Sequence, residues 1–452
     1  MGSLIEDKVG RLSLAGGKAL LAISGGIDSM CLASSCKAAG VDFAVAHCNF
    51  HLRGQDSDAD AELVRSWCSS SGVECFVKDF DTALYASSRG ISVEMAAREQ
   101  RYCWFAELCR DKGYVALVVA HNANDNAETL FLNLLRGTGL KGMCGMQPET
   151  MAEWGGIEIR ILRPLLGVTR AEIEAYVAKN GVPFRDDVTN AETVYKRNKI
   201  RHKVLPVLEE LNPSFLNTLS SDMANLREAK AVLDDWFEFT CLDVLTYSTG
   251  ADVCIKIDAL LASHNWKYFL FRYLNTYGFN RAVVGEICEL LSRTDRPEPG
   301  KVFEAAEYCV ATAAGVLEIY RKIEPFSVEV SSEGEYQCGD VRVKVSVEPV
   351  PESLIQPEGT VILDASLIKF PFTLRSWRDG DWMKPLGMRG CRKKLSDIFV
   401  DMKMSLPQKS RAVLLEYPGD EGRIAAIVGL RIDESMKVKA SSSMVIRLTI
   451  VR

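Results

Sequence analysis

The chain has 452 residues, of which 47% are hydrophobic and 25% charged, a composition typical of a globular protein long enough for two or three domains. Its net charge of −6 argues against a globally basic nucleic-acid binder, and no apolar run is long enough to cross a bilayer. The fourteen cysteines form no Cys-x-x-Cys pair, and no secretion signal opens the chain. We therefore expect a cytoplasmic protein with reduced thiols and no membrane partner.

An apolar run over residues 19–23 predicts a buried strand. It leads directly into Ser24, Gly25, Gly26, Ile27, Asp28 and Ser29, after which the apolar spacing becomes helical. Glycine lets the backbone approach oxygen atoms closely, and the free amides of a helix start favour an anion. Asp28 would repel a bare phosphate, so its presence indicates a Mg²⁺ ion between the carboxylate and the phosphates. A structural turn capped by Asp28 is the alternative, but the complete string favours nucleotide phosphate binding.

Two further strands are predicted at residues 44–46 and 115–120, and polar residues follow each of them. Such polar strand ends meet at the ligand-binding edge of an open α/β sheet. After the second of these strands, Asp125 and Glu128 lie three residues apart near the start of a helix, so both carboxylates point to one side. They could cap the helix, coordinate Mg²⁺ or hold a cationic ligand. The continued alternation of strands and helices predicts a doubly wound parallel sheet.

Basic residues stand out on one predicted helix and in two patches. Arg98 and Arg101 lie at helical spacing from Glu94 on a predicted amphipathic helix, where a surface ladder of Glu–Arg pairs is the alternative. Residues 193–203 carry five Lys and Arg and no acid, and residues 371–411 carry ten Lys and Arg against four Asp. Such patches on an acidic protein are typical of phosphate-backbone recognition, although either patch alone is equally consistent with a solvated loop.

The sequence pattern changes twice along the chain. Helical spacing persists over residues 213–237 and 266–291, a hairpin is predicted within 302–321, and strand alternation begins after residue 340. We therefore expect an α/β domain over residues 1–213, a mostly α domain over 214–325 and a small α+β domain over 326–452.

Taken in order, these strings resemble the tRNA(Ile)-lysidine synthetase family, within the PP-loop ATP pyrophosphatase superfamily. The segments that carry the resemblance are residues 24–29, 47–53, Glu94 with Arg98, Arg101 and Tyr102, 121–142, 163–166, Asp186 and Asp187, 197–202, 378–381, 385–387, 393–397 and 429–431. The resemblance implies an adenine nucleotide alpha hydrolase-like first domain and tRNA contacts in the other two. It also implies two reaction steps. ATP adenylates the C2 oxygen of the wobble cytidine in a CAU-anticodon tRNA(Ile) and releases pyrophosphate; L-lysine then attacks C2 and expels AMP.

The resemblance implies roles for individual residues. ATP would be held by Ser24, Gly25, Gly26, Ile27, Asp28 and Ser29, with Asp28 also the Mg²⁺ ligand. Asp125 and Glu128 would bind the lysine cation and, with Asp28 and Arg98, form the catalytic set. The tRNA would contact Arg197, Arg201, Lys384, Arg389, Arg392, Lys393 and Lys394, of which Arg197 and Arg201 could instead meet the triphosphate. Either a monomer or a homodimer is compatible with this picture.

The chain departs from the family pattern at three positions. Family sequences commonly have His where Phe50 and Asn122 stand and Asp where Asn124 stands, so both asparagines are left out of the catalytic set. One rival function is a tRNA thiolase, which the lack of Cys-x-x-Cys pairs disfavours. Another is an enzyme that adenylates a small carboxylate, which would leave the basic patches without a purpose. A tRNA-binding module with a degenerate loop is a third, and the intact string at residues 24–29 speaks against it.

Overall fold

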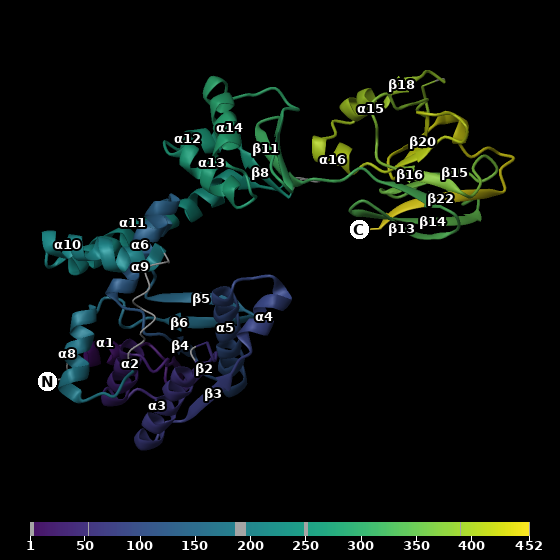
Figure 1. Cartoon of the computed structure of the whole chain (residues 1–452). Coiled ribbons are helices and arrows are strands. Elements are labelled where there is room, and N and C mark those ends of the chain that lie inside the picture. Colours follow the sequence, from purple (N-terminus) through teal and green to yellow (C-terminus); the bar gives the residue numbers. More distant parts are fainter. Residues whose placement is uncertain (1–3, 53, 186–195, 248–251, 389, 452) are drawn as a thin grey trace. The chain divides into compact units, whose positions relative to one another are not determined.

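The computed structural model describes residues 4–52, 54–185, 196–247, 252–388 and 390–451 (Figure 1). The chain forms two compact units, Met1–Asp234 and Asp235–Arg452, and the boundary between them lies within the long helix α11 (Phe215–Val244). The division into three domains stays a prediction. Among the described residues, none of the helices combines the length and the apolarity that a bilayer crossing needs.

The N-terminal unit is built on a six-stranded sheet with the order β3-β2-β1-β4-β6-β5. Its strands are β1 (Ala19–Ala22), β2 (Phe43–Asn49), β3 (Cys75–Asp79), β4 (Ala116–Val118), β5 (Glu149–Trp154) and β6 (Ile157–Leu162). The pairs β3–β2, β2–β1, β1–β4 and β4–β6 are parallel, which confirms the predicted parallel sheet. The edge strand β5 pairs antiparallel with β6. The strand order reverses between β1 and β4, which is where an open α/β sheet binds its ligand.

Helices cover both faces of this sheet, as a doubly wound fold requires (Figure 1). One face carries α1 (Leu4–Gly10), α2 (Ile27–Ala38), α3 (Gln55–Ser71) and α8 (Arg170–Asn180), and the other carries α5 (Val93–Lys112) with α4 (Thr82–Arg89) beside it. Leu21 packs toward the first set of helices and its neighbour Leu20 toward the second. The strands are therefore buried on both faces, which explains their uninterrupted apolar sequence.

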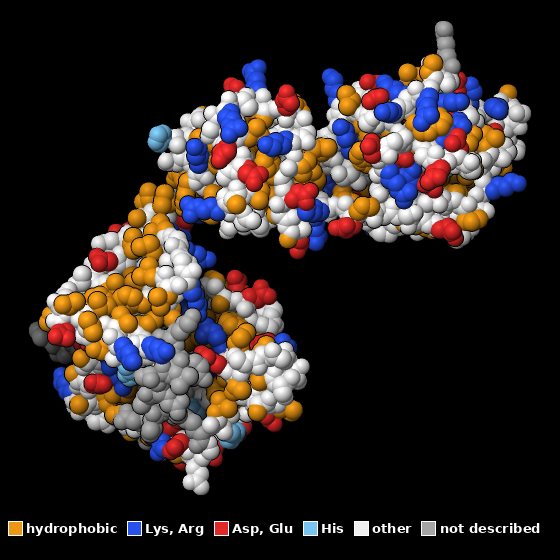
Figure 2. Space-filling model, turned by 45° about the horizontal axis from the view of Figure 1, so that its top comes forward, with side chains coloured by type: hydrophobic (Ala, Val, Ile, Leu, Met, Phe, Trp, Pro, Cys, Tyr) orange, Lys and Arg blue, Asp and Glu red, His pale blue; other side chains and the backbone are white. Residues whose placement is uncertain are grey.

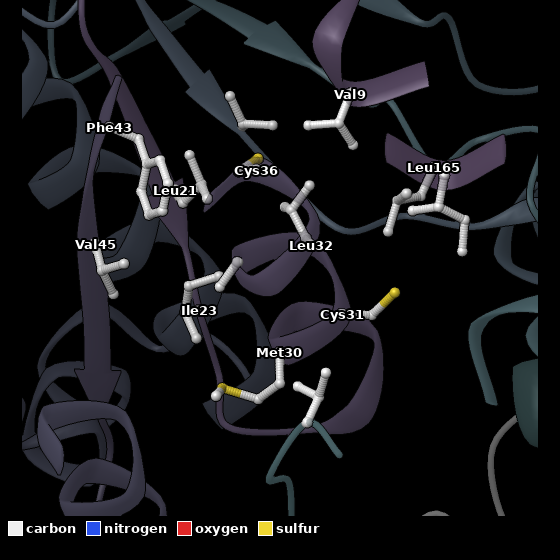
Figure 3. Packing of buried hydrophobic residues seen from close by; sticks show 14 of the residues in the cluster. Val9, Leu21, Ile23, Met30, Cys31, Leu32, Cys36, Phe43, Val45 and Leu165 are labelled. Atoms are coloured by element: carbon white, nitrogen blue, oxygen red, sulfur yellow. The ribbon is translucent and has the colours of Figure 1, made fainter. Parts of the chain in front are cut away.

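Tight packing fixes the elements on either side of residues 24–29. Figure 3 shows Leu21 and Ile23 lying opposite Met30 and Leu32 of α2, and all four side chains are buried. Burial of one such side chain contributes roughly 1.5–3 kcal/mol to folding. The connection between β1 and α2 is therefore anchored at both ends.

A helical segment completes the N-terminal unit. Its helices are α6 (Ala123–Arg136), α7 (Leu140–Met143), α9 (Lys196–Lys199), the π-helical turn η2 (Ile200–Val204) and α10 (Leu205–Leu211). Residues 196–211 are thus helical throughout, with a π-helical turn inside the segment. Such turns are rare and occur frequently at functional sites. Ile200 and Leu205 pack against Ala127 of α6, so this segment is held next to α6.

Residues 235–325 combine helices with a five-stranded antiparallel sheet of order β7-β8-β11-β10-β9. The helices are α12 (Ile257–Ala262), α13 (Trp266–Asn275) and α14 (Arg281–Arg293), and the strands are β7 (Leu245–Thr246), β8 (Val253–Lys256), β9 (Val302–Glu304), β10 (Tyr308–Ala313) and β11 (Val316–Arg321). The predicted hairpin is confirmed as β10 and β11. The other three strands have two to four residues, too few for a strand period to show in the sequence.

Residues 326–451 contain two antiparallel sheets that share one core, with orders β12-β16-β19-β20-β21 and β13-β14-β22-β15. The strands are β12 (Ser327–Val330), β13 (Gly334–Cys338), β14 (Val341–Pro349), β15 (Thr360–Asp364), β16 (Phe372–Arg375), β19 (Leu414–Glu416), β20 (Ile424–Ile427), β21 (Arg431–Ile432) and β22 (Met444–Val451). A small ribbon of β17 (Trp382–Met383) and β18 (Lys393–Lys394) precedes α15 (Leu395–Asp401) and α16 (Leu406–Ser410). The predicted α+β character of this region is confirmed.

Candidate functional site

Residues 24–29, called the PP-loop below, connect β1 to α2. Gly25 has a φ of +92°, and an added Cβ would lie 3.3 Å from the Cβ of Asp60, so this position requires glycine. Ser29 Oγ donates to Gly26 O at 2.8 Å and lies 3.1 Å from Ser24 Oγ, which braces the loop. The N-cap of α2 is Gly26, so the alternative in which Asp28 is the cap is wrong. Since no side chain caps α2 among the described residues, its first amides are available to an anion.

Three helix starts meet at Asp28, which itself lies in the first turn of α2. Its Oδ1 accepts a hydrogen bond of 3.0 Å from Nδ2 of Asn122, the N-cap of α6. Its Oδ2 lies 2.8 Å from Nη1 of Arg170, the first residue of α8. Each helix start carries about half a positive charge. The end of the sheet beside the PP-loop is therefore strongly favourable for a multiply charged anion.

A cavity of about 300 Å³ opens beside the PP-loop, at the point where the strand order reverses. Its lining consists of Ala22, Ser24, Gly26, Ile27, Asp28, Ser29, Arg101, Tyr102, Phe105, Val119, Ala120, His121, Arg170 and Arg185. A smaller cavity of about 110 Å³ shares Arg101 with it and is walled by Phe50 and Phe105. The three arginines and the loop amides suit phosphate groups, and the apolar walls suit a flat ring.

Burial and neighbouring charges shift two titratable groups of this cavity. Burial raises the pKa of Asp28, and the Arg170 guanidinium opposes that rise. Burial lowers the pKa of His121 to about 4, and the charge of Arg163 lowers it further. Arg163 Nε donates to His121 Nδ1 at 3.3 Å, which places the imidazole proton on Nε2. His121 is therefore a neutral hydrogen-bonding group near pH 7.

Asp125 and Glu128 are brought together with Arg197 and Arg201 in one cluster. Glu128 is fully buried, and its two carboxylate oxygens each lie 2.5 Å from the Nε of one arginine. Asp125 Oδ1 lies 3.1 Å from Arg197 Nη2 and 3.4 Å from Arg201 Nη2. Asp125 also forms a reciprocal capping pair with Asn122. The residues predicted to bind lysine and two of those predicted to bind tRNA thus neutralise one another in this structure.

Arg98 packs against two stacked aromatic rings beside the cavity. Its guanidinium carbon is 4.8 Å from the ring centre of Tyr102 and 5.9 Å from that of Trp154, and the two rings stack at 4.9 Å. Its charge contributes to the lowered pKa of His121, so it acts on the cavity electrostatically. Among the described residues no ion pair joins Glu94 to Arg98 or Arg101, so the Glu–Arg ladder does not form. The catalytic role of Arg98 stays a prediction.

The basic patch of residues 371–411 is partly exposed and partly paired. Arg392 is exposed and lies with its guanidinium carbon 4.0 Å from the ring centre of Trp382, and Lys394 beside it is also exposed. Lys393 is paired with Asp401, and Lys384 donates its backbone N–H to Asp433 Oδ2. Arg389 lies outside the described residues. Figure 2 shows Lys and Arg side chains interspersed with Asp and Glu on the visible face of the C-terminal unit.

One motif of this patch is structural. Asp381, from the string at 378–381, accepts two hydrogen bonds of 2.8 Å from Arg375, and both side chains are almost fully buried. Its Oδ2 also accepts from the backbone N–H of Arg378 at 2.7 Å. Arg375 and Asp381 therefore hold the turn that presents Trp382, and Arg375 does not belong to the exposed basic surface.

Sequence reasoning missed Arg170 and Arg185 in the cavity. A signal for Arg170 was present, because Thr169 and Glu172 form a capping box that marks the start of α8. Arg185 pairs with Asp56 and Asp60 of α3, which are 129 and 125 residues away in the chain. A single sequence does not reveal contacts between residues so far apart in the chain.

The cavity, the glycine loop and the charge clusters define a class, an ATP-utilising α/β enzyme domain built on a PP-loop. A PP-loop domain model matches residues 3–208, and a model described as the TilS substrate binding domain matches residues 248–312. The chain is 36% identical to a tRNA(Ile)-lysidine synthase from Bacteroides thetaiotaomicron over 97% of each chain, and 36% identical to one from Parabacteroides distasonis over 94% of each. A Porphyromonas gingivalis protein of the same name is 34% identical over 88% of this chain and 86% of its own length. The chain belongs to the tRNA(Ile)-lysidine synthase family.

Proposed function

We propose that this protein joins L-lysine to C2 of the wobble cytidine in CAU-anticodon tRNA(Ile), through an adenylated tRNA and with release of AMP and pyrophosphate. The observation that carries the proposal is the meeting of the PP-loop and the Asp125–Glu128 cluster at one end of the sheet, with Asn122 in contact with both Asp28 and Asp125. The relatives named tRNA(Ile)-lysidine synthase, similar over nearly the whole chain, supply the substrate class.

The first step forms a bond between the C2 oxygen of cytidine and the α-phosphorus of ATP and breaks the bond to the β-phosphate. Ser24, Ser29 and the loop amides hold the phosphates, while Arg101 and Arg170 face the cavity where negative charge develops. Adenylation makes the C2 oxygen a good leaving group.

Mg²⁺ fits this site through Asp28 and through the oxygens of ATP. The described residues contain no group of three or more His, Cys, Asp or Glu placed to hold a metal ion, so the nucleotide would supply most of the ligands. That arrangement is usual for Mg²⁺, which is commonly held by one or two carboxylates plus substrate phosphates. When bound, the ion neutralises charge on the triphosphate.

In the second step one lysine amine, in its neutral form, forms a bond to C2 and gives up a proton to solvent, and the C2–O bond breaks to release AMP. We assign the lysine ammonium group to Asp125 and Glu128. Asp125 is 17% exposed and Glu128 is fully buried between two arginines, so Asp125 is the acid within easier reach of a ligand. Binding of lysine there requires Arg197 or Arg201 to exchange a carboxylate for another anion, such as a phosphate of tRNA or ATP.

The tRNA body is assigned to residues 214–452, with Lys384, Arg389, Arg392, Lys393 and Lys394 as its contacts in the last region. The exposed pair Arg392 and Lys394 beside Trp382 supports this, because cations next to an aromatic ring are typical of nucleic-acid surfaces. A cytoplasmic location and a monomeric or dimeric state complete the proposal.

Incorporation of labelled lysine into unmodified CAU-anticodon tRNA(Ile) tests the proposal directly, with ATP and Mg²⁺ present and tRNA(Met) as control. We expect label in tRNA(Ile) alone. Release of AMP and pyrophosphate without labelled tRNA would retain the adenylation step but contradict lysine as the nucleophile. Absence of any nucleotide turnover would favour the tRNA-binding module instead.

A further inference from the structure

Asp28 and Arg170 belong to a closed ring of contacts that joins three helices. Asn122, the N-cap of α6, donates its amide to Asp28 Oδ1 at 3.0 Å. Two residues further on, Asn124 Oδ1 accepts a hydrogen bond of 3.0 Å from the backbone N–H of Arg170. The ring closes through Arg170 Nη1, which lies 2.8 Å from Asp28 Oδ2. Asn122 and Asn124 are two of the three positions at which this chain departs from the common family pattern.

The Arg170 guanidinium has a donor that the ring does not use. Its Nε donates to Glu174 at 2.8 Å and its Nη1 to Asp28, whereas Nη2 has no hydrogen-bond partner among the described residues. The side chain is 39% exposed and lines the 300 Å³ cavity together with the PP-loop. A fixed guanidinium with a free N–H next to three helix starts is suited to a phosphate oxygen.

The two asparagines explain why Arg170 is held in this place. The Asn124 contact fixes the first residue of α8 against α6, and the backbone bond from Ala123 N to Val168 O at 2.9 Å runs alongside it. Both amides are neutral, so the cluster gains no charge from them. The position of the guanidinium is therefore set through hydrogen bonds, while its charge is left for the ligand and for Asp28.

We propose that Arg170 is a further contact for the triphosphate of ATP and that Asn124 is its positioning residue. The inference rests on ATP use by the PP-loop domain but on neither tRNA nor lysine. Arg170 contributes one direct hydrogen bond to a phosphate oxygen through Nη2, in addition to its contact with Asp28.

Isothermal titration of the full-length protein with ATP in EDTA tests this, because it needs neither metal nor turnover. We expect Arg170→Gln to raise the Kd for ATP about tenfold, the loss of one charge-assisted hydrogen bond. Arg170→Lys keeps the charge, and its Kd for ATP should lie between those of wild type and Arg170→Gln. The matched control is Arg89→Gln, since Arg89 also pairs with one glutamate, at 3.0 Å from Glu99, but lies outside the cavity lining. Arg89→Gln should leave the Kd within twofold of wild type.

A second background separates phosphate contact from mere neutralisation of Asp28. In Asp28→Asn protein that carboxylate charge is gone, and a contact with ATP still predicts a tenfold loss when Arg170→Gln is added. A loss that appears only with Asp28 intact, or no loss in either background, would overturn the inference. If wild-type protein binds no ATP either in EDTA or with Mg²⁺ added, the proposed function falls as well.

The positioning role of Asn124 has its own readout. Asn124→Ala removes the oxygen that accepts from Arg170 N, and we expect the Kd for ATP to rise severalfold. Asn124→Asp keeps an acceptor oxygen and should restore the affinity for ATP. The comparison holds if the two variants have the same melting temperature, since both are then equally well folded. Equal affinity of the alanine variant and wild type would show that Asn124 does not position Arg170.

Discussion

Three arginines of the N-terminal unit, Arg170, Arg197 and Arg201, differ from Arg392 beside Trp382 in what they contact. Arg170, Arg197 and Arg201 are each bound to carboxylates at distances of 2.5–3.4 Å, so their positions are fixed before any ligand arrives. Arg392 is exposed, stacks on the partly buried ring of Trp382 and has no carboxylate within ion-pair distance among the described residues. Fixed guanidinium groups favour a reaction that requires accurate geometry, whereas exposed ones favour docking to a flexible polyanion.

The fixed charges of the N-terminal unit are tested most strongly at Asp28, where we expect the largest loss of activity from a single substitution. Asp28→Ala should lower pyrophosphate release at least about 1,000-fold, because it removes the proposed metal ligand and one of the two carboxylates that hold Arg170. Pyrophosphate release in the presence of tRNA measures this. Asp111→Ala, which removes an exposed acid of the same unit, is the control and should keep full activity. Normal release by the Asp28 variant would remove this residue from the catalytic set.

The next effect separates the two reaction steps. Asp125→Asn should spare adenylation but lower lysine incorporation about 100-fold, since it removes a charge from the proposed ammonium site and keeps an oxygen for the helix cap. Trapping of labelled AMP on tRNA in the absence of lysine measures the first step, and labelled lysine measures the second. An equal loss of both steps would contradict the separation of roles.

Replacing Glu128 in the same cluster should lower the stability of the protein, whereas replacing Asp125 should lower lysine incorporation. Glu128→Gln leaves Arg197 and Arg201 facing each other beside a buried neutral amide, and we expect a loss of about 2–3 kcal/mol in the free energy of unfolding. The melting temperature of this variant should therefore fall, while that of the Asp125 variant should change little.

The sequence predicted those parts that depend on local pattern. The buried strand before the PP-loop, the parallel sheet and the polar residues at the end of β4 all follow from spacing and composition. Edge strand β5 was missed, although its exposure alternates along its length, because it lies next to glycine and polar residues that interrupt the signal. The family of the chain followed from the order of the motifs, and the relatives confirm it.

The sequence did not predict the partners of the charged residues. Asp125 and Arg197 were assigned to different ligands, yet they lie 3.1 Å apart in a contact that spans 72 residues of the chain. Asp381 belonged to a motif typical of the family but serves the buried pair with Arg375. Pairing of this kind depends on tertiary contacts between distant segments, and one sequence without relatives carries no record of it.

A smaller effect is expected at the exposed patch. Arg392→Ala should weaken tRNA binding about threefold to tenfold, reduce the salt dependence of binding by about one ion and leave the Kd for ATP unchanged. Filter binding over a range of salt concentrations measures it. Lys393→Ala is the matched control, because Lys393 is already paired with Asp401 and should lose less affinity. A larger loss for Lys393 than for Arg392 would reverse the distinction between paired and exposed cations.

The smallest effect concerns pH and the buried histidine of the cavity. The pKa of His121 is about 4 in the folded protein, against about 6.5 in an unfolded chain, because burial and Arg163 disfavour its charged form. Between these two values the unfolded state binds more protons, so the stability of the N-terminal unit should fall as pH decreases from 6.5 to 4 and level off below. Melting temperatures measured across this range test the expectation.

His47 is buried with its Nδ1 2.9 Å from Ile23 O, and its lowered pKa contributes in the same direction. His121→Gln should therefore reduce the slope of melting temperature against pH without abolishing it. A slope that is the same in His121→Gln and wild type would show that His121 is not held neutral by its surroundings.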